Sequence, residues 1–137
     1  MTHEELFEFI RRHRYVVIAT MNPDSTPQSA VVGIAVTKDL EIVFDCTQGS
    51  RKHRNLKLNP AIAIACWSGE IEAQYEGIAQ EAQGADRDRI REVYFESFPG
   101  GRDRLSWPGI THFLVRPKWI RYSDFDARPP HIEEFKF

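Results

Sequence analysis

The chain has 137 residues, with 18 lysines and arginines against 20 aspartates and glutamates, and a formal net charge of −2. This length predicts one domain, residues 1–137, that can bury a core without disulfides or metal ions. The charge argues against a general nucleic-acid binder, which would be strongly basic. No apolar stretch approaches the roughly 20 residues that cross a bilayer. The start of the chain, residues 1–5, is acidic where a secretory signal is basic, so we expect a cytoplasmic protein with no membrane partner.

The first predicted element is a helix that begins after Thr2. Thr2 and Glu5 form a capping-box pattern, and Leu6 and Ile10 fall on one helical face. Most of the remaining chain consists of β-branched or alternating apolar runs separated by turn-forming clusters. The six predicted strands cover residues 15–21, 28–36, 40–46, 61–67, 71–83 and 110–124.

Two further helices interrupt these strands. A basic helix follows the third strand at residues 51–57, and an apolar stripe predicts another helix over residues 86–98. A Gly/Pro-rich loop, residues 99–109, leads into the last strand, and we expect the tail, residues 127–137, to lie on the body or on a partner subunit. Six strands without long βαβ alternation predict a mainly β fold, with an antiparallel sheet closed into a barrel and short helices packed outside.

The two cysteines, Cys46 and Cys66, both fall within apolar strand-like runs. We expect free, buried thiols in a reducing compartment. No spacing of His, Cys, Asp and Glu resembles a structural zinc site, and no nucleophile elbow is present. The sequence therefore predicts neither a metal site nor a hydrolytic triad.

The junction between the third strand and the basic helix carries most of the functional information. Ser50, Arg51 and Lys52 follow Gly49 at the start of this helix. Free backbone N–H groups and the positive end of the helix dipole favour an anion there, and the two cations suit a phosphate. Taken alone, a basic helix is more often a solvated face; its place after a strand and a glycine favours a phosphorylated ligand.

This element also carries a family resemblance. Gly49-Ser50-Arg51-Lys52, followed by Asn59-Pro60, resembles the corresponding stretch of the pyridoxamine 5′-phosphate oxidase-like FMN-binding split barrels. The resemblance extends from about Tyr15 to Ser123. It implies a six-stranded antiparallel split β-barrel with short peripheral helices, a single FMN-binding domain over residues 1–137, and a homodimer with FMN in a groove between the subunits.

The resemblance also assigns residues to the cofactor in four groups. They are Ser50, Arg51 and Lys52 at the ribityl phosphate; Ala30, Val31 and Val32 beneath the isoalloxazine; Asp45, Cys46 and Thr47 near the ribityl chain or ring edge; and Gln74 on the fifth strand. The family glutamine on that strand falls nearest Glu72, and Gln74 lies two residues on, on the same strand face.

Three departures separate the chain from the vitamin oxidases proper. These enzymes have an arginine and a lysine on the second strand, where the matching positions here are Ala30 and Ala35. They also carry a C-terminal Arg-x-His element, which residues 130–135 do not contain, and the fifth-strand position nearest their glutamine is Glu72. The resemblance therefore supports the flavin phosphate site and gives no support for a vitamin phosphate as substrate.

The leading interpretation is an FMN-dependent oxidoreductase that acts on a small organic molecule or takes electrons from a nicotinamide cofactor. No side chain identifies itself as a general acid or base, so the catalytic residues are unassigned. Trp107 is the best candidate for a cap over the ring. One alternative is a flavin carrier without turnover, or a haem-binding barrel with His112 or His53 as axial ligand. Another is a barrel that uses a deazaflavin or no cofactor.

Overall fold

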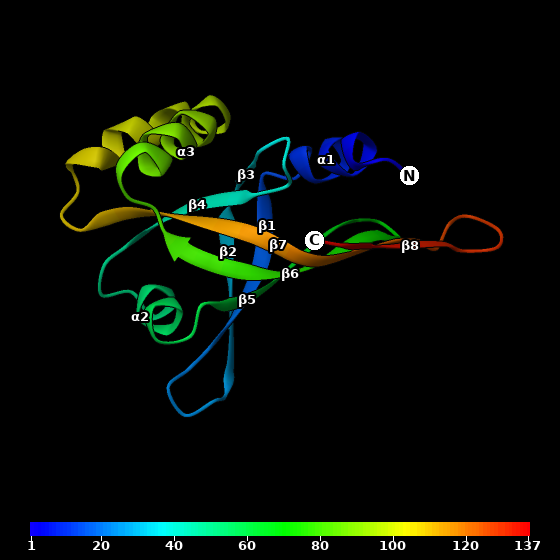
Figure 1. The fold of residues 1–137 in the computed structure, drawn as a ribbon, viewed down its shortest axis with the longest axis horizontal. Coiled ribbons are helices and arrows are strands. Elements are labelled where there is room, and N and C mark those ends of the chain that lie inside the picture. Colours follow the sequence, from blue (N-terminus) through cyan, green and yellow to red (C-terminus); the bar gives the residue numbers. More distant parts are fainter.

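The computed structural model of the protein describes residues 1–137 and is mainly β, as predicted (Figure 1). In chain order the elements are α1 His3–Arg11, β1 Tyr15–Met21, β2 Pro27–Gly33, β3 Ala35–Val36, β4 Ile42–Thr47, α2 Arg51–Leu58, β5 Ala61–Ser68, β6 Ile71–Glu81, α3 Gly84–Ser97, the 3₁₀-helix η1 Pro99–Ser106, β7 Ile110–Asp124 and β8 His131–Lys136. None of the helices is both long and apolar enough to span a membrane.

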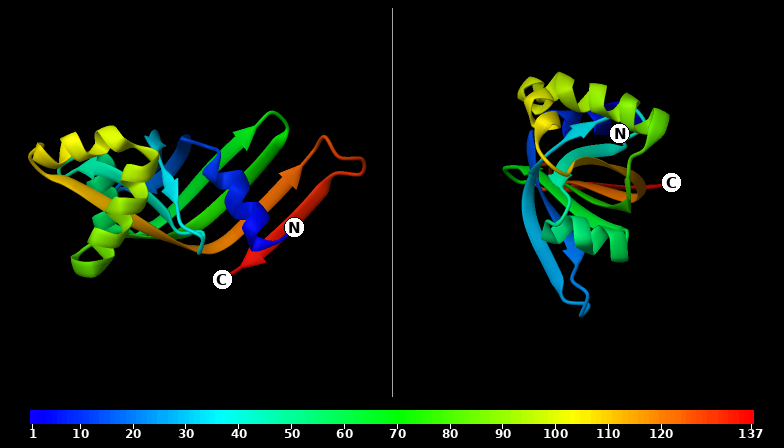
Figure 2. Two further views of the ribbon diagram at one scale, coloured as in Figure 1. Left: turned by 90° about the horizontal axis from the view of Figure 1, so that it is seen from above. Right: turned by 90° about the vertical axis from the view of Figure 1, so that its left-hand side faces the viewer.

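All strand pairings are antiparallel, and seven strands follow the order β2-β1-β5-β6-β7-β4-β3, with β8 added on β7. The sheet curls until the end strand β2 contacts β4, which gives the predicted split barrel (Figures 1 and 2). Its interior holds a continuous apolar core, to which α1 contributes Leu6, Phe9 and Ile10. The apolar stripe of α1 therefore covers an opening of the barrel, as the residue pattern predicts.

The number of strands differs from the six that were expected, because the structure has eight. The predicted strand at residues 28–36 is two strands: at Ile34 the chain leaves β1, with the Ile34 amide donating to the Arg14 carbonyl, and re-pairs with β4 as β3. The tail forms β8 and lies on the body. Its Glu134 accepts hydrogen bonds from Trp119 and Arg121 of β7.

The segment between α3 and β7 also differs from expectation. Instead of an irregular loop, residues 99–106 form the 3₁₀-helix η1, which begins at Pro99. Proline suits the first turn of a helix because it has no N–H to leave unpaired. α3 lies outside the barrel and packs Ile90, Tyr94 and Phe95 against β3, β4 and β7, which forms a second, smaller core.

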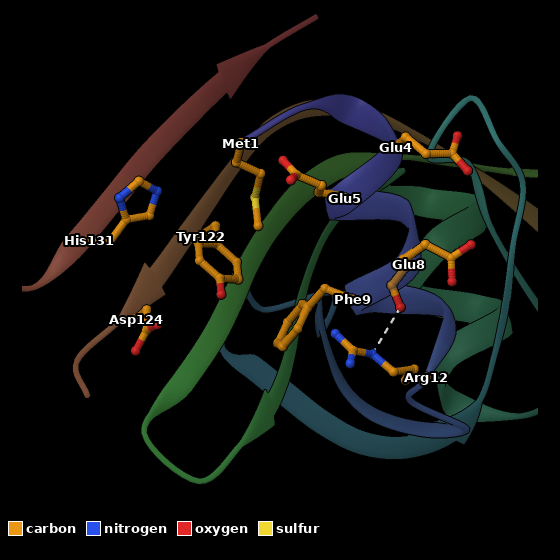
Figure 3. A pocket seen from close by; sticks show the side chains of 9 residues that line it. All are labelled: Met1, Glu4, Glu5, Glu8, Phe9, Arg12, Tyr122, Asp124 and His131. Atoms are coloured by element: carbon orange, nitrogen blue, oxygen red, sulfur yellow. Dashed lines mark hydrogen bonds between the residues drawn. The ribbon is translucent and has the colours of Figure 1, made fainter. Parts of the chain in front are cut away.

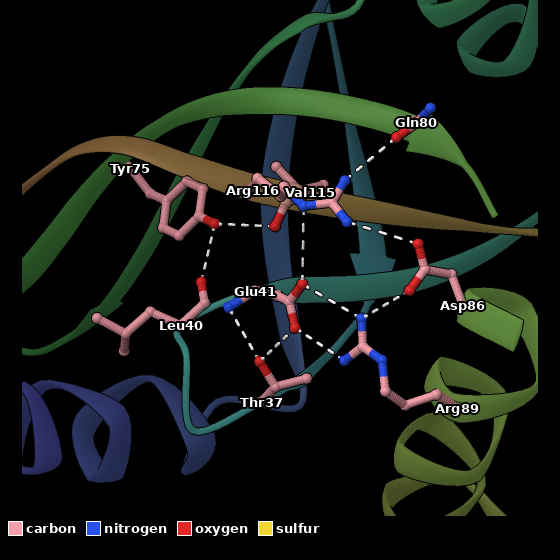
Figure 4. A network of polar contacts seen from close by, with 9 residues as sticks. All are labelled: Thr37, Leu40, Glu41, Tyr75, Gln80, Asp86, Arg89, Val115 and Arg116. Carbon is pink, nitrogen blue, oxygen red and sulfur yellow. Dashed lines mark hydrogen bonds and ion pairs between the residues drawn. The ribbon is translucent and has the colours of Figure 1, made fainter. Parts of the chain in front are cut away.

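A partly buried polar network ties this outer layer to the barrel (Figure 4). Glu41 is 8% exposed; it pairs with Arg89 of α3 at 2.9 Å and accepts a hydrogen bond from Thr37 at 3.0 Å. Nearby, the buried Tyr75 hydroxyl lies 2.9 Å from the Leu40 carbonyl and 3.2 Å from the Val115 carbonyl. Tyr75 thus anchors the turn between β3 and β4 to β7 from inside the barrel.

Replacing Tyr75 by phenylalanine tests this anchor. The change removes the donor shared by two buried carbonyl oxygens, so the free energy of unfolding should fall by about 1–3 kcal/mol. Urea unfolding measures it. Tyr15→Phe is the matched control, since Tyr15 is 62% exposed and should change the stability by less than about 0.5 kcal/mol. Equal stability of the Tyr75 variant and the wild type would contradict the prediction.

Candidate functional site

The turn from β4 into α2 determines where the site begins. Gly49 has φ +87°, a left-handed conformation, and a Cβ built on it would meet no atom within 4 Å. Backbone conformation and not crowding therefore favours glycine at this position. The Ser50 amide then donates to the Thr47 carbonyl at 3.1 Å, which closes the turn directly ahead of the helix.

Ser50 is the N-cap of α2, as its place in the sequence suggests. Its Oγ accepts a hydrogen bond from the His53 amide at 3.3 Å, and its hydroxyl group faces the Cys46 thiol. The first turn of α2 contains no acidic residue. The helix start therefore presents unpaired N–H groups and the positive end of the dipole without a neutralising carboxylate in its own first turn.

The cations of α2 divide into two groups: those that contact Glu81, and Arg51, Lys52 and Arg54, which pair with no acidic residue. His53 and Lys57 approach the Glu81 carboxylate at 3.2 and 3.3 Å. Arg51, which is exposed, and Lys52, which is half-buried, take part in no ion pair or side-chain hydrogen bond. The two cations that the sequence singled out are thus the ones at the helix start that are free to bind an external anion.

Cys46 lies beside this helix start on the inner face of β4. It is buried, and burial raises the pKa of its thiol to about 11, although the Lys52 charge and a hydrogen bond with Ser50 act in the opposite direction. The thiol is protonated at neutral pH and is no nucleophile there. Both predicted free cysteines are buried in the structure.

Asp45 points to the other face of β4, toward α3 and η1. Its carboxylate accepts hydrogen bonds from Arg104 Nε at 2.8 Å and from the Tyr94 hydroxyl at 3.2 Å, and Arg104 also donates to that hydroxyl. This cluster fixes η1, and with it the exposed Trp107, beside the end of β4. Sequence reasoning placed Asp45 near the site but missed Tyr94 and Arg104, which lie 49 and 59 residues away along the chain.

The strand assigned to the flavin ring is an edge of the sheet. β2 pairs with β1 along one side only, so its other backbone edge is open to a ligand or a partner. Val31 is 67% exposed, Val32 is buried, and Ala30 packs partly against the core. Both β2 and α2 contact β4, so these two parts of the predicted site lie around the same strand.

Gln74 lies apart from this group. It is exposed on the outer face of β6, opposite Ala65, and its side chain donates to Glu72 at 2.8 Å. No hydrogen bond or ion pair joins it to α2. Within one chain, the structure does not bring Gln74 to the helix start.

The two histidines considered as axial ligands are both engaged. His112 is 1% exposed between Tyr94 and Phe95; its Nδ1 accepts from Arg91 at 3.3 Å, and its Nε2 is buried without a partner. Burial, followed by the Arg91 charge, lowers the pKa of His112 to about 4. The other histidine is held against Glu81. Neither ring offers a nitrogen that is both exposed and free of a partner.

Two larger hollows have no residue of α2 in their walls. One, of about 540 Å³, opens beneath α1, and Figure 3 shows its wall of Phe9 and Tyr122 with the acidic side chains of Glu4, Glu5 and Glu8 around it. The other, of about 590 Å³, lies on the outer face of the sheet. Its lining residues are mostly small or apolar and come mainly from β1, β5 and β6: Ala19, Met21, Ala61, Ala63, Gly77, Ile78 and Trp119.

Comparison with known proteins identifies the family. The family described as pyridoxamine 5′-phosphate oxidase matches residues 2–124. The chain belongs to this family. A pyridoxine/pyridoxamine 5′-phosphate oxidase of Rubrobacter xylanophilus is 31% identical over 94 residues, which are 67% of this chain and 42% of that protein. The chain spans about half the length of the curated relatives it matches.

Two solved structures share the fold. A haem-binding protein from Mycobacterium smegmatis has a TM-score of 0.84 at 14% identity, covering 98% of this chain and 57% of its own. A pyridoxamine 5′-phosphate oxidase-related, FMN-binding protein from Nostoc punctiforme has a TM-score of 0.69 at 10% identity, covering 98% of this chain and 92% of its own. These likenesses confirm the split-barrel fold.

The contacts of Glu81 with α2 and β7 make the stability of the protein depend on pH. Partial burial raises the pKa of Glu81, but hydrogen bonds from Thr111, Lys57 and His53 outweigh it, so the pKa lies below the ordinary value of 4.5. The folded protein therefore favours the ionised form of Glu81. The contribution of Glu81 to the free energy of unfolding is complete above about pH 4.5 and is lost as the pH falls through the pKa of Glu81 in the folded state.

We therefore expect the difference in unfolding free energy between the wild type and Glu81→Gln to be largest near neutral pH and to shrink below about pH 4.5. Urea unfolding across this range measures it, with Glu70→Gln in an exposed turn as the control. A difference that stays constant down to the acid transition would contradict the assignment.

Proposed function

We propose that the chain is an FMN-binding domain that binds the ribityl phosphate at the start of α2. The observation that carries the proposal is the pair of unpaired cations, Arg51 and Lys52, at a helix start with no acidic residue in its first turn. A phosphate dianion satisfies both cations and the free N–H groups at once. The Ser50 hydroxyl would add a third type of donor by turning from the Cys46 thiol to the phosphate.

The remaining assigned residues would arrange the rest of the groove. Ala30, Val31 and Val32 would offer the open backbone edge of β2 to the isoalloxazine. Thr47 and the region around Cys46 would line the ribityl side. Asp45 would act indirectly, by holding η1 and Trp107 beside the groove through Arg104.

Bound FMN would supply hydride or two-electron transfer, and the protein supplies binding, orientation and exclusion of water. The substrate would be a small organic molecule, with a nicotinamide cofactor as a candidate electron donor. No side chain of the site stands as a general acid or base, and Cys46 is protonated. Because the site has no assigned general acid or base, a flavin carrier without turnover is the second candidate function. A haem role through His112 or His53 is less favoured because both rings are engaged.

The first test is an absorption spectrum of the purified protein with added FMN, together with titrations of FMN and riboflavin. Arg51→Ala and Lys52→Ala should each weaken FMN binding by about 10- to 100-fold, the loss expected for one hydrogen bond to a charged group, and should change riboflavin binding little. Arg54→Ala, on an exposed and unpaired cation of the same helix, is the matched control. Absence of FMN binding in the wild type would overturn the proposal.

We further propose a homodimer that buries the outer face of β1, β5 and β6. This face presents exposed alanines at positions 61, 63 and 65 beside the exposed Trp67 and Ile78, which is an extended apolar surface for a single chain. Gln74 lies on this same face, so it would reach a flavin groove from the second copy.

A charged residue in this face should separate the dimer. Ala63→Arg places a guanidinium opposite Glu76 on the neighbouring strand, where the single chain tolerates it. The same guanidinium puts a charged group into the proposed contact between the two copies. Sedimentation or light scattering should give the monomer mass for this variant and the dimer mass for the wild type and for Asp126→Arg in the β7–β8 turn. A wild-type monomer, or a dimer that tolerates Ala63→Arg, would contradict the assignment.

A further inference from the structure

Glu81, at the end of β6, joins the helix that carries the phosphate site to the barrel. One carboxylate oxygen accepts a hydrogen bond from Thr111 of β7 at 2.8 Å. The other lies 3.2 Å from His53 Nε2 and 3.3 Å from Lys57 Nζ, both on α2. The Glu81 side chain is 14% exposed, so this is a partly buried contact and not a surface ion pair.

The contacts of Glu81 restrain α2 at two points one turn apart. His53 and Lys57 are four residues apart and therefore lie on one face of the helix. The His53 ring also packs edge-on against Phe113 of β7, with ring centroids 5.8 Å apart. A helix held at both points on one face has little freedom to rotate about its axis or to slide along the sheet.

His53 links this restraint directly to the start of the helix. Its backbone amide donates to Ser50 Oγ, while its side chain contacts Glu81. The same residue therefore belongs to the N-cap and to the anchor. A change in the position of the His53 backbone would move Ser50 and the neighbouring free cations together.

The negative charge of Glu81 does not favour the binding of a phosphate. A carboxylate near an anion site repels the anion and neutralises cations that would attract it. Here Glu81 engages His53 and Lys57 and leaves Arg51 and Lys52 free. Any benefit of Glu81 to the site is therefore geometric, through the position of α2, and not electrostatic.

We propose that Glu81 is a positioning residue for the phosphate site: through Thr111, His53 and Lys57 it fixes α2 on the barrel so that Ser50, Arg51 and Lys52 converge on one anion. The inference rests on the proposed function, because it concerns the same site. It adds a residue that the sequence did not single out and that does not itself contact the ligand.

The two possible roles of Glu81 predict effects of opposite sign. If Glu81 acted only through its charge, Glu81→Ala would remove a repulsion and tighten FMN binding. If it positions α2, the same change weakens FMN binding, by about tenfold or more if one charge-assisted phosphate contact is lost. Thr111→Val removes one contact of the carboxylate without changing any charge, so it should weaken FMN binding in the same direction.

The experiment measures FMN and riboflavin dissociation constants for the wild type, Glu81→Ala and Thr111→Val. Loss confined to FMN supports positioning of the phosphate site, because general destabilisation would weaken both ligands. Glu92→Ala, which removes an exposed carboxylate of α3 paired with Arg102, is the charge-matched control and should bind FMN like the wild type. Unchanged or tighter FMN binding by Glu81→Ala would overturn the inference.

Amide hydrogen exchange on the ligand-free protein gives a second, independent readout. The His53 and Arg54 amides, which donate to Ser50 Oγ and to the Ser50 carbonyl, should exchange faster in both variants than global unfolding explains. Wild-type exchange at these amides would also overturn the inference, and Thr111→Val answers the question even where Glu81→Ala folds poorly. If the wild type binds no FMN, the proposed function fails, and the exchange rates alone decide whether Glu81 anchors α2.

Discussion

The start of α2 depends on one conformational constraint, the left-handed turn at Gly49. β4 is held in register by β7 up to Thr47, so the chain has only the residues between Thr47 and Arg51 in which to reverse into a helix. Gly49 makes this reversal at φ +87°, and Ser50 then caps the helix. The free N–H groups and the two unpaired cations follow from that geometry, as does their position beside β4, the strand that β2 also contacts.

The distribution of charge on α2 supports the proposal that this helix start binds an external anion. Five basic side chains lie on the helix, but His53 and Lys57 are engaged by Glu81 on the side that faces the barrel. The cations left unpaired on the first turn are Arg51 and Lys52. Ala35, one of the two second-strand positions at which the sequence departs from the vitamin oxidases, packs in the small core beneath α3.

Much of this arrangement follows from local sequence. Strand runs, the capping box at Thr2 and the Gly49–Lys52 element are short-range patterns, and they predicted the barrel and the helix start correctly. The break at Ile34 was not predicted because no polar residue interrupts residues 30–36, and only pairing with two different strands divides the segment. The strand β8 was missed because residues 131–136 are mostly polar and carry no clear strand pattern. They form a strand because they pair with the edge of β7.

The tertiary contacts around the site could not be predicted from the sequence, because they join residues that are far apart along the chain. Glu81 meets His53 across 28 residues, and Arg104 meets Asp45 across 59. Each pair depends on the strand order, because β6, β7 and β4 are neighbours in the sheet and their ends lie side by side. Gln74 lies on the outer face because side chains alternate along β6, with Ala73 and Tyr75 buried on either side of it. The proposed flavin site could therefore take up Gln74 only from a second copy of the chain.

A crystal structure of the protein with FMN tests the central claim most directly. We expect the phosphate at the start of α2, with its oxygens within about 3 Å of the Ser50 hydroxyl and of the Arg51 and Lys52 side chains, and the ring along β2. Density for the phosphate elsewhere, for example in the hollow beneath α1, with Arg51 and Lys52 still unpaired, would contradict the account.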